Sequence, residues 1–341
     1  MEGYLAKNVY KCSSNSGLSR CCFLIWSSAL SRNTKNIRKG CVVMHFGNVL
    51  TAMVTPFDQS GDIDFEATKG LINYLISNGS DGLVVAGTTG ESPTLSHEEK
   101  LSLFKFVVDV VGGRVPVIAG TGSNNTKASV ELTKEATAIG VDAIMLVAPY
   151  YNKPSQEGLY QHFRTIAEST NLPIMVYNIP GRSVVNIEPS TIIRLSQVDN
   201  IVSVKEASGN LDNVAEIISK TADDFSVYTG EDGLTLPTIA VGGTGVVSVS
   251  SHIIGNEMQD MIQHFKNGDV AYAASMHRHI LPMMKALFAA PSPTPLKEAL
   301  NHIGVPVGGV RLPLVPLNET ERAALFQVLA NYEDKEEVAG Y

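Results

Sequence analysis

The run Ile201-Val-Ser-Val-Lys-Glu-Ala-Ser208 holds one lysine inside a stretch that is otherwise typical of a buried strand. β-Branched residues favour strands, and successive side chains of a strand point to opposite faces. This alternation places Lys205 on the same face as Ile201 and Ser203. The residues between them, together with Glu206, are expected on the opposite face.

A lysine on a buried strand face is open to two interpretations. An ammonium that loses its hydration must find a partner or give up its proton, and a lysine with a lowered pKa is a good nucleophile toward a carbonyl carbon. The simpler interpretation is a covered aliphatic stem whose charged head reaches water. The rest of the sequence favours the nucleophile.

Seven further apolar runs recur along the chain, roughly 20–33 residues apart, with helix-like segments between them. Together with 201–205, the runs are 49–54, 82–86, 115–119, 143–148, 173–177, 225–229 and 245–249. They are solidly apolar, as in a parallel sheet that is buried on both faces. Strands that alternate with helices indicate an α/β fold, and eight such units predict a closed (β/α)8 TIM barrel.

Local signals mark the helix ends of this barrel. Ser96-His-Glu-Glu99 is a capping box, and Pro189 suits a first helical turn. Gly79 and Gly140 are each expected to end a helix. About 90 residues after the eighth run keep helical periodicity and are predicted to form extra C-terminal helices on the barrel.

The first 43 residues differ in composition from the rest. They carry a net charge of +6, against −14 for residues 44–341, and they hold all four cysteines. A transit peptide, a weak signal-peptide core, or an over-long gene model that truly starts at Met44 would each account for them. We favour the last, which N-terminal sequencing of the native protein would test. The predicted segments are a basic extension (1–43), the barrel (44–270) and a C-terminal helical extension (271–341).

Composition also excludes several classes of protein. An acidic body argues against nucleic acid or an anionic membrane as a partner, and no apolar run approaches the length of a membrane span. A body without cysteine is neither a disulfide scaffold nor a thiolate-metal protein. His277 and His279 form a His-x-His on a helical stretch, where they face apart. We therefore predict a cytoplasmic protein without a bound metal or cofactor.

Polar residues gather where the predicted strands end. The ends are Gly87-Thr-Thr-Gly-Glu-Ser92, Pro149-Tyr-Tyr-Asn152, Tyr177-Asn-Ile-Pro-Gly-Arg182 and Gly230-Glu-Asp232, beside the strand of Lys205. Active sites of such barrels lie at the C-terminal ends of the strands. Each motif alone has a structural explanation, as a tight turn or as packing aromatics. Their coincidence at one end of the barrel argues for a site.

Tyr177 and Lys205 are expected on neighbouring strands with both side chains pointing inward. An amine beside a phenol in a dry barrel suits Schiff-base chemistry, in which the amine attacks a keto carbonyl and the phenol moves protons. Hydroxyls and backbone N–H groups of Thr88 and Thr89 could hold a small carboxylate. Arg182 could hold a second one in a bidentate fashion.

The motifs Gly87–Ser92, Pro149-Tyr-Tyr-Asn-Lys-Pro154, Tyr177–Arg182 and Val204-Lys-Glu-Ala-Ser208 resemble those of the dihydrodipicolinate synthase (4-hydroxy-tetrahydrodipicolinate synthase) family. The resemblance runs from about residue 44 to about residue 317. It implies condensation of pyruvate with L-aspartate 4-semialdehyde, the first committed step toward lysine and diaminopimelate. It also implies a homodimer or homotetramer and no cofactor.

The resemblance implies a role for each site residue. Lys205 would form the Schiff base with pyruvate, and Tyr177 would act as acid and base. Tyr177 would be linked through Thr88 to Tyr151, which comes from the neighbouring subunit. Thr89 would bind the pyruvate carboxylate.

Three further residues complete the implied pocket. Arg182 would receive the carboxylate of the semialdehyde at the entrance, and Gly230 and Val247 match further pocket positions. Two alternatives remain: another pyruvate-dependent aldolase, such as N-acetylneuraminate lyase or a keto-deoxy-sugar-acid aldolase, and a non-enzymatic barrel. The double threonine Thr88-Thr89 and Arg182 favour a small carboxylated aldehyde over a sugar acid.

Many members of the family that the motifs resemble are inhibited by lysine at a dimer interface. The matching positions in this chain are Ser92, His97, Asn124 and Tyr150. Lys100 stands where sensitive bacterial members have a histidine, and Ala128 where they have a glutamate. Loss of a carboxylate and gain of a cation should repel a diamine, so little or no inhibition by lysine is expected.

Overall fold

The computed structural model describes the backbone of residues 46–339 and the side chains of residues 46–332. The described residues belong to one compact unit. The predictions for residues 1–43 lie outside this range, and the proposed three-segment division stays a prediction.

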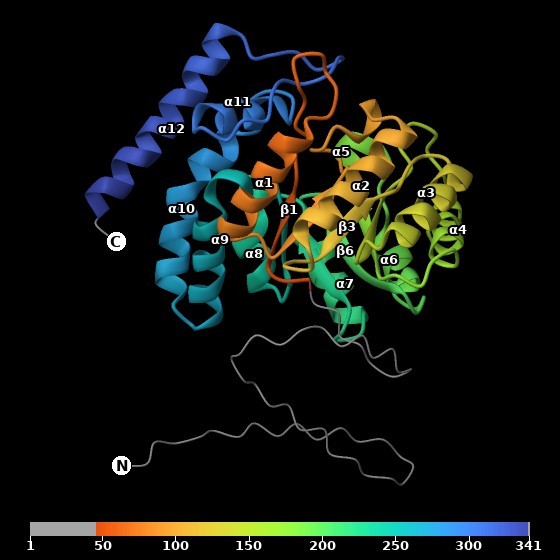
Figure 1. Cartoon of the computed structure of the whole chain (residues 1–341). Helices are drawn as coiled ribbons and strands as arrows, with labels where there is room; N and C mark the ends of the chain where they lie inside the picture. Colours follow the sequence, from red (N-terminus) through yellow and green to blue (C-terminus); the bar gives the residue numbers. More distant parts are fainter. Residues whose placement is uncertain (1–45, 340–341) are drawn as a thin grey trace, which may run out of the picture. The chain divides into compact units, whose positions relative to one another are not determined.

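Eight parallel strands form a closed barrel in which each strand pairs with its neighbours in chain order (Figure 1). They are β1 (Val49–Ala52), β2 (Gly82–Val85), β3 (Val117–Gly120), β4 (Ala143–Val147), β5 (Ile174–Asn178), β6 (Ile201–Glu206), β7 (Ser226–Thr229) and β8 (Gly245–Ser248). Every predicted run contains or overlaps one of these strands. The predicted (β/α)8 barrel is therefore confirmed.

Helices surround the barrel on its outside. They are α1 (Phe65–Ser77), α2 (His97–Val111), α3 (Thr126–Ile139), α4 (Gln156–Ala167), α6 (Pro189–Leu195), α7 (Leu211–Lys220), α8 (Thr235–Ala240) and α9 (Ser251–Lys266). Single-turn elements lie in the loops: η1 (Ser92–Thr94), α5 (Pro180–Ser183) and η2 (Asp232–Leu234). The predicted capping box is present, because Ser96 Oγ accepts a hydrogen bond from Glu99 N and Glu99 Oε2 accepts one from Ser96 N.

Strand β6 departs from simple alternation at its start. Ile174 pairs with Ile201, but Met175 pairs with Ser203, so Val202 is an extra residue in a bulge. Ile201 consequently packs in the outer core between strands and helices, whereas Val202 packs against the inner core of the barrel. The prediction that Ile201 shares the face of Lys205 is wrong, because the bulge shifts the alternation by one residue.

Three helices extend the chain beyond the barrel: α10 (Val270–Ala286), α11 (Thr294–His302) and α12 (Glu319–Ala339). In Figure 1 the connection between α11 and α12 lies beside the loop that follows β1, and Phe57 N donates to Val307 O there over 3.1 Å. On α12, Arg322 pairs with Glu298 of α11 (3.2 Å). The predicted C-terminal helices are present, and their connection returns to the barrel. None of the helices in the described range is both long and apolar enough to cross a membrane.

Candidate active site

Lys205 and Tyr177 lie side by side inside the barrel. They are paired in the register of β6 and β5, and the Lys205 Nζ lies 4.2 Å from the centroid of the Tyr177 ring. Both side chains are about 5 % exposed. Because the strands place these side chains, their juxtaposition is fixed by the backbone rather than by a flexible loop.

Burial sets the protonation of this pair. Desolvation lowers the pKa of Lys205 to about 8, although the carboxylates of Asp232 and Glu231 act in the opposite direction. The same effect raises the pKa of Tyr177 to about 12, against the lowering influence of Arg182 and of a hydrogen bond with Thr88. At pH 7 roughly a tenth of the amine is therefore neutral, while the phenol stays protonated.

Gly230 allows the backbone of the β7 end to approach the Lys205 side chain. A Cβ added at Gly230 would lie 2.7 Å from Lys205 Cε and 2.6 Å from Ala207 Cβ, distances that real Cβ atoms almost never show. Gly230 N donates to Glu206 O over 2.8 Å, which holds it there. Val247 belongs to the inner core that lines the barrel interior. Both predicted pocket positions therefore shape the barrel interior, and Gly230 does so directly against Lys205.

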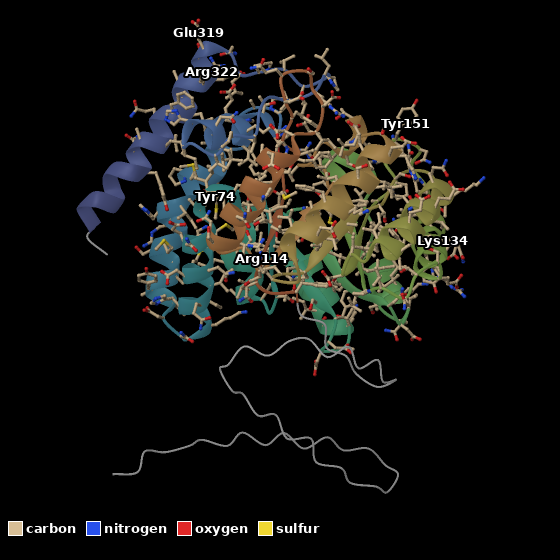
Figure 2. All side chains as sticks on the ribbon, viewed as in Figure 1. Tyr74, Arg114, Lys134, Tyr151, Glu319 and Arg322 are labelled. Carbon is tan, nitrogen blue, oxygen red and sulfur yellow. The ribbon has the colours of Figure 1, made fainter. Side chains whose placement is uncertain are left out.

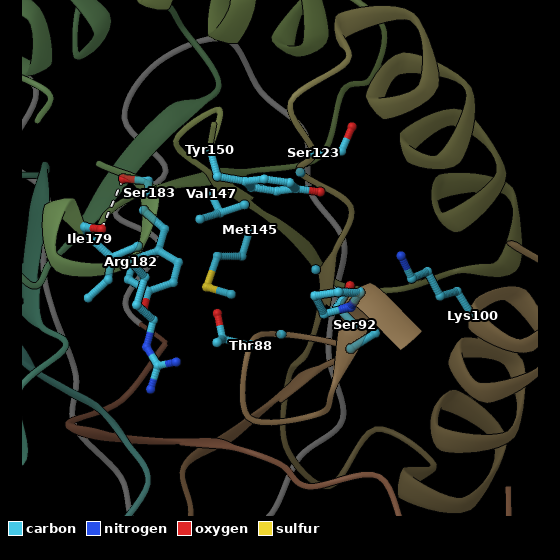
Figure 3. Close-up of a pocket in the computed structure, with 16 residues that line it drawn as sticks. Thr88, Ser92, Lys100, Ser123, Met145, Val147, Tyr150, Ile179, Arg182 and Ser183 are labelled. Atoms are coloured by element: carbon cyan, nitrogen blue, oxygen red, sulfur yellow. Dashed lines mark hydrogen bonds between the residues drawn. The ribbon is translucent and has the colours of Figure 1, made fainter. Parts of the chain in front are cut away.

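A cavity of about 270 Å³ opens at the C-terminal end of the barrel (Figure 3). Thr88, Tyr177 and Arg182 line one part of it, and Lys100 and Tyr150 line another. Among the described residues that line it are two cations, Lys100 and Arg182, and no carboxylate, so the cavity suits a small anion. Lys205 is not among the residues that line the cavity, but its Nζ lies over the ring of Tyr177, which does line it.

Arg182 is carried by the single turn α5 that directly follows β5. Ser183 Oγ lies 2.9 Å from both Ile179 O and Val185 O and can donate its one hydrogen to either, so it bridges the two ends of the turn. Figure 3 shows the contact with Ile179. Within the described residues the Arg182 side chain forms no ion pair, and it lines the cavity. It is thus available to a ligand at the entrance.

Tyr151 does not reach the other predicted site residues of its own chain. Its side chain is 87 % exposed and projects from the surface (Figure 2). Thr89, in contrast, is buried in the loop after β2. One chain therefore brings together Lys205, Tyr177 and Thr88 but leaves Tyr151 outside.

Left-handed backbone conformations cluster around this site. The described non-glycine residues with positive φ are Ala86, Glu91, Tyr151, Lys153 and Val184. All five lie in the loops that follow β2, β4 and β5, which are the loops that carry the predicted site motifs. A β-branched residue such as Val184 rarely adopts this conformation, and strain of this kind persists where the surrounding structure enforces it.

Sequence reasoning gave no role to two buried carboxylates near the strand ends. Asp232 Oδ2 accepts hydrogen bonds from Ser250 Oγ (2.8 Å) and Ser250 N (3.0 Å), which connects the β7 and β8 ends. Glu206 accepts from Asn178 Nδ2 and from Ser208 N, which connects the β5 and β6 ends. Their position at polar strand ends was the available signal, but the partners Asn178 and Ser250 come from neighbouring strand ends and are not adjacent in the sequence.

Comparison with known proteins places the chain among biosynthetic enzymes. Residues 45–332 match the model of the Dihydrodipicolinate synthetase family. This match continues past residue 317 into α12, farther than the sequence motifs predicted. The chain is 63 % identical over 290 residues to the 4-hydroxy-tetrahydrodipicolinate synthase of Oceanobacillus iheyensis, with 85 % of this chain and 98 % of the relative covered.

Solved structures agree with this similarity. The crystal structure of dihydrodipicolinate synthase DapA-2 from Bacillus anthracis superposes with a TM-score of 0.83 at 61 % identity, covering 84 % of this chain and 98 % of the other. The dihydrodipicolinate synthase of Cyanidioschyzon merolae with lysine bound gives a TM-score of 0.84 at 45 % identity, covering 85 % and 99 %.

Proposed function

This chain belongs to the dihydrodipicolinate synthetase family, and on that premise we propose that it condenses pyruvate with L-aspartate 4-semialdehyde through a Schiff base on Lys205. The reaction is the entry into lysine and diaminopimelate biosynthesis. The observation that carries the residue assignment is the dry amine of Lys205 beside the phenol of Tyr177, at facing positions of two neighbouring strands.

The neutral amine of Lys205 attacks the keto carbon of pyruvate. Tyr177 supplies the proton with which the carbonyl oxygen leaves as water, and an iminium remains on Lys205. The iminium withdraws electrons from the neighbouring methyl carbon, which loses a proton to the Tyr177 phenolate and becomes part of an enamine. This carbon attacks the aldehyde of the second substrate, whose oxygen takes that proton back from Tyr177, and the iminium on Lys205 is restored. The amino group of the semialdehyde then replaces Lys205 at the iminium carbon and closes the ring, the lysine leaves as a neutral amine, and the spare proton returns to the Tyr177 phenolate.

Two anion-binding groups orient the substrates. Thr89 and the backbone N–H groups of its loop bind the pyruvate carboxylate, and Arg182 binds the carboxylate of the semialdehyde at the cavity entrance. The absence of a lining carboxylate in the cavity supports this arrangement, because both substrates are anionic. Gly230 and Val247 leave room around the reacting carbon.

The proton relay is completed by a second copy of the chain. Tyr151 of one subunit extends to Thr88 and Tyr177 of its neighbour, so the active enzyme is a homodimer or homotetramer. Two observations support this: the Tyr151 side chain is 87 % exposed, and its backbone is held in a left-handed conformation. The molar mass of the unmodified protein in solution should be that of a dimer or tetramer. The same measurement on Tyr151→Ala shows whether the chains still associate when the tyrosine of the proton relay is removed.

A substrate panel tests the proposed function against its relatives. The purified protein is incubated with pyruvate and L-aspartate 4-semialdehyde, or with N-acetylneuraminate or a keto-deoxy-sugar acid alone, and the products are followed by NMR. We expect condensation only in the first case. Cleavage of the sugar acids without turnover of the semialdehyde would assign the chain to another aldolase.

Schiff-base formation should depend on pH through Lys205. The amine is protonated and unreactive below its pKa of about 8, so only roughly one molecule in a hundred is neutral at pH 6. The initial rate of adduct formation, trapped with borohydride, should rise steeply from pH 6 to pH 8 and then level off. A rate that stays flat across this range would show that another step or another group controls adduct formation.

Lysine is expected to cause little or no inhibition at low millimolar concentration. The ammonium of Lys100 lines the cavity, and no carboxylate is among the described residues that line it. A diamine would meet a cation where it needs an acceptor. Steady-state rates at increasing lysine concentration measure this, and a steep fall would contradict it.

The double variant Lys100→His/Ala128→Glu provides the converse test. The first substitution removes the cation of Lys100, and the second introduces a carboxylate at position 128 of α3. The double variant is therefore expected to gain sensitivity to lysine. Ala128→Glu alone serves as the matched control, because it adds the carboxylate but keeps the cation. We expect it to remain less sensitive than the double variant.

A further inference from the structure

A buried ion pair connects the loop after β2 to the C-terminal helices. Glu91 Oε1 lies 2.7 Å from Lys297 Nζ, and the two side chains are 1 % and 2 % exposed. Glu91 is the fifth residue of the Gly87–Ser92 motif, whereas Lys297 lies on α11. The same Nζ donates to Gly309 O over 2.7 Å, in the connection that follows α11.

Arg311 adds a second cation from the same connection. Its backbone N donates to Glu91 Oε2 over 2.9 Å, so both carboxylate oxygens of Glu91 contact the C-terminal segment. The Arg311 guanidinium pairs with Glu99 of the α2 capping box and donates to Thr94 O over 2.8 Å. Lys297 and Arg311 also lie over the ring of Phe57, at 4.1 and 4.3 Å from its centroid. The loop is thereby held at several points along its length.

The geometry of Glu91 transmits this hold to the residues of the site. Glu91 adopts a left-handed conformation (φ 55°, ψ 35°), and its N–H donates to Thr88 O over 3.1 Å. On the other side of the loop, Thr55 Oγ1 donates to Gly90 O over 2.7 Å. Gly90 and Glu91, which directly follow Thr88 and Thr89, are therefore held by the loop after β1 on one side and by the C-terminal segment on the other.

Stability alone gives little reason for a buried ion pair at this place. Two charges lose their hydration here, and well-packed apolar residues of similar size often stabilise a fold as well or better. Charge-assisted hydrogen bonds differ from apolar contacts in that they fix direction. What the pair adds is a defined orientation of the loop.

We propose that Glu91, Lys297 and Arg311 form a clamp that positions Thr88 and Thr89 for the reaction. The C-terminal helices are then part of the catalytic apparatus and not an appendage of the barrel. Glu91, Lys297 and Arg311 are positioning residues, since none of them is among the residues that line the cavity. This inference rests on the function proposed for Lys205 and its neighbours.

Lys297→Met and Arg311→Gln test the clamp, with Arg322→Met as the matched control. Arg322 joins α12 to Glu298 of α11 and does not reach the loop (Figure 2). Rates are measured well below the melting temperature of each variant. We expect kcat to fall roughly tenfold or more in the two clamp variants, because a small misplacement of a reacting group is costly. Arg322→Met should keep the kcat of the unmodified enzyme even if its melting temperature falls equally.

Two further readouts separate positioning from general destabilisation. Borohydride trapping of pyruvate on Lys205 should still go to completion in the clamp variants, because β6 carries that lysine. Glu91→Gln, which keeps the side-chain shape and an acceptor oxygen for one of the two partners, should retain more of kcat than Glu91→Ala. Full kcat and an unchanged pyruvate KM in Lys297→Met and Arg311→Gln would overturn the proposal.

Backbone amide hydrogen exchange tests the clamp by a measurement that does not depend on enzyme activity. Peptides that cover residues 87–95 should exchange faster in Lys297→Met and Arg311→Gln but not in Arg322→Met. Unchanged exchange in the clamp variants would refute the clamp. If the unmodified protein did not condense the two substrates, the proposed function would fail, and this would be visible before any variant is compared.

Discussion

Replacing Lys205 with alanine is expected to reduce condensation by about a thousandfold or more. The substitution removes the only group in the account that forms a covalent bond with the substrate, and loss of a nucleophile typically costs several orders of magnitude. The fold should survive, because alanine is small and apolar and the site is enclosed by the barrel core. Steady-state assays with both substrates, combined with thermal unfolding, measure the two effects separately.

Lys297 offers an internal control for this result. It is also a buried lysine, burial lowers its pKa to about 8 as well, and it also lies against an aromatic ring. Its Nζ is occupied by Glu91 and by Gly309 O, whereas no carboxylate of the described residues lies within salt-bridge distance of Lys205. If a lowered pKa were sufficient for reactivity, both lysines would react with pyruvate. We expect only Lys205 to do so.

Tyr177→Phe is expected to lower kcat about a hundredfold or more and to change the pyruvate KM little. The variant keeps the ring that covers Lys205 but removes the hydroxyl that moves protons, and general acid–base groups contribute about 10²–10⁴ in rate. Stopped-flow or steady-state kinetics at saturating concentrations of both substrates measure the loss.

Tyr228→Phe is the matched control for this variant. Lys205 is flanked in the register by Tyr177 on one strand and by Tyr228 on the other. The Tyr228 hydroxyl donates to Gly47 O over 3.0 Å and is absent from the cavity lining. Its removal should leave kcat nearly unchanged. Equal losses in the two variants would show that the effect reflects packing around the lysine and not proton transfer.

The sequence predicts the barrel well because its strands are buried on both faces. Solidly apolar runs separated by capped helices leave few alternatives, and the Ser96 capping box illustrates how local such signals are. The inward orientation of Lys205 and Tyr177 also follows from the alternation of side chains along a strand. Their position close to the strand ends places both at the C-terminal end of the barrel. The bulge at Val202 did not disturb Lys205, because alternation resumes at Ser203.

Other features depend on contacts that no local pattern records. The residue at the bulge is a valine among apolar neighbours, so nothing in its type marks the extra position. The clamp joins Glu91 to residues of the C-terminal segment that lie far away in the chain. Val184 has a positive φ, which β-branched residues rarely adopt, so its backbone conformation is imposed by the surrounding fold. Such features become visible only when the chain is folded.

The most direct test of the account is mass spectrometry of the protein after reduction with borohydride in the presence of pyruvate. Peptide mapping locates any modified lysine among all lysines of the chain. We expect one reduced pyruvate adduct per chain, on Lys205, and none on Lys297. An unmodified Lys205, or an adduct on another lysine that supports normal turnover, would contradict it.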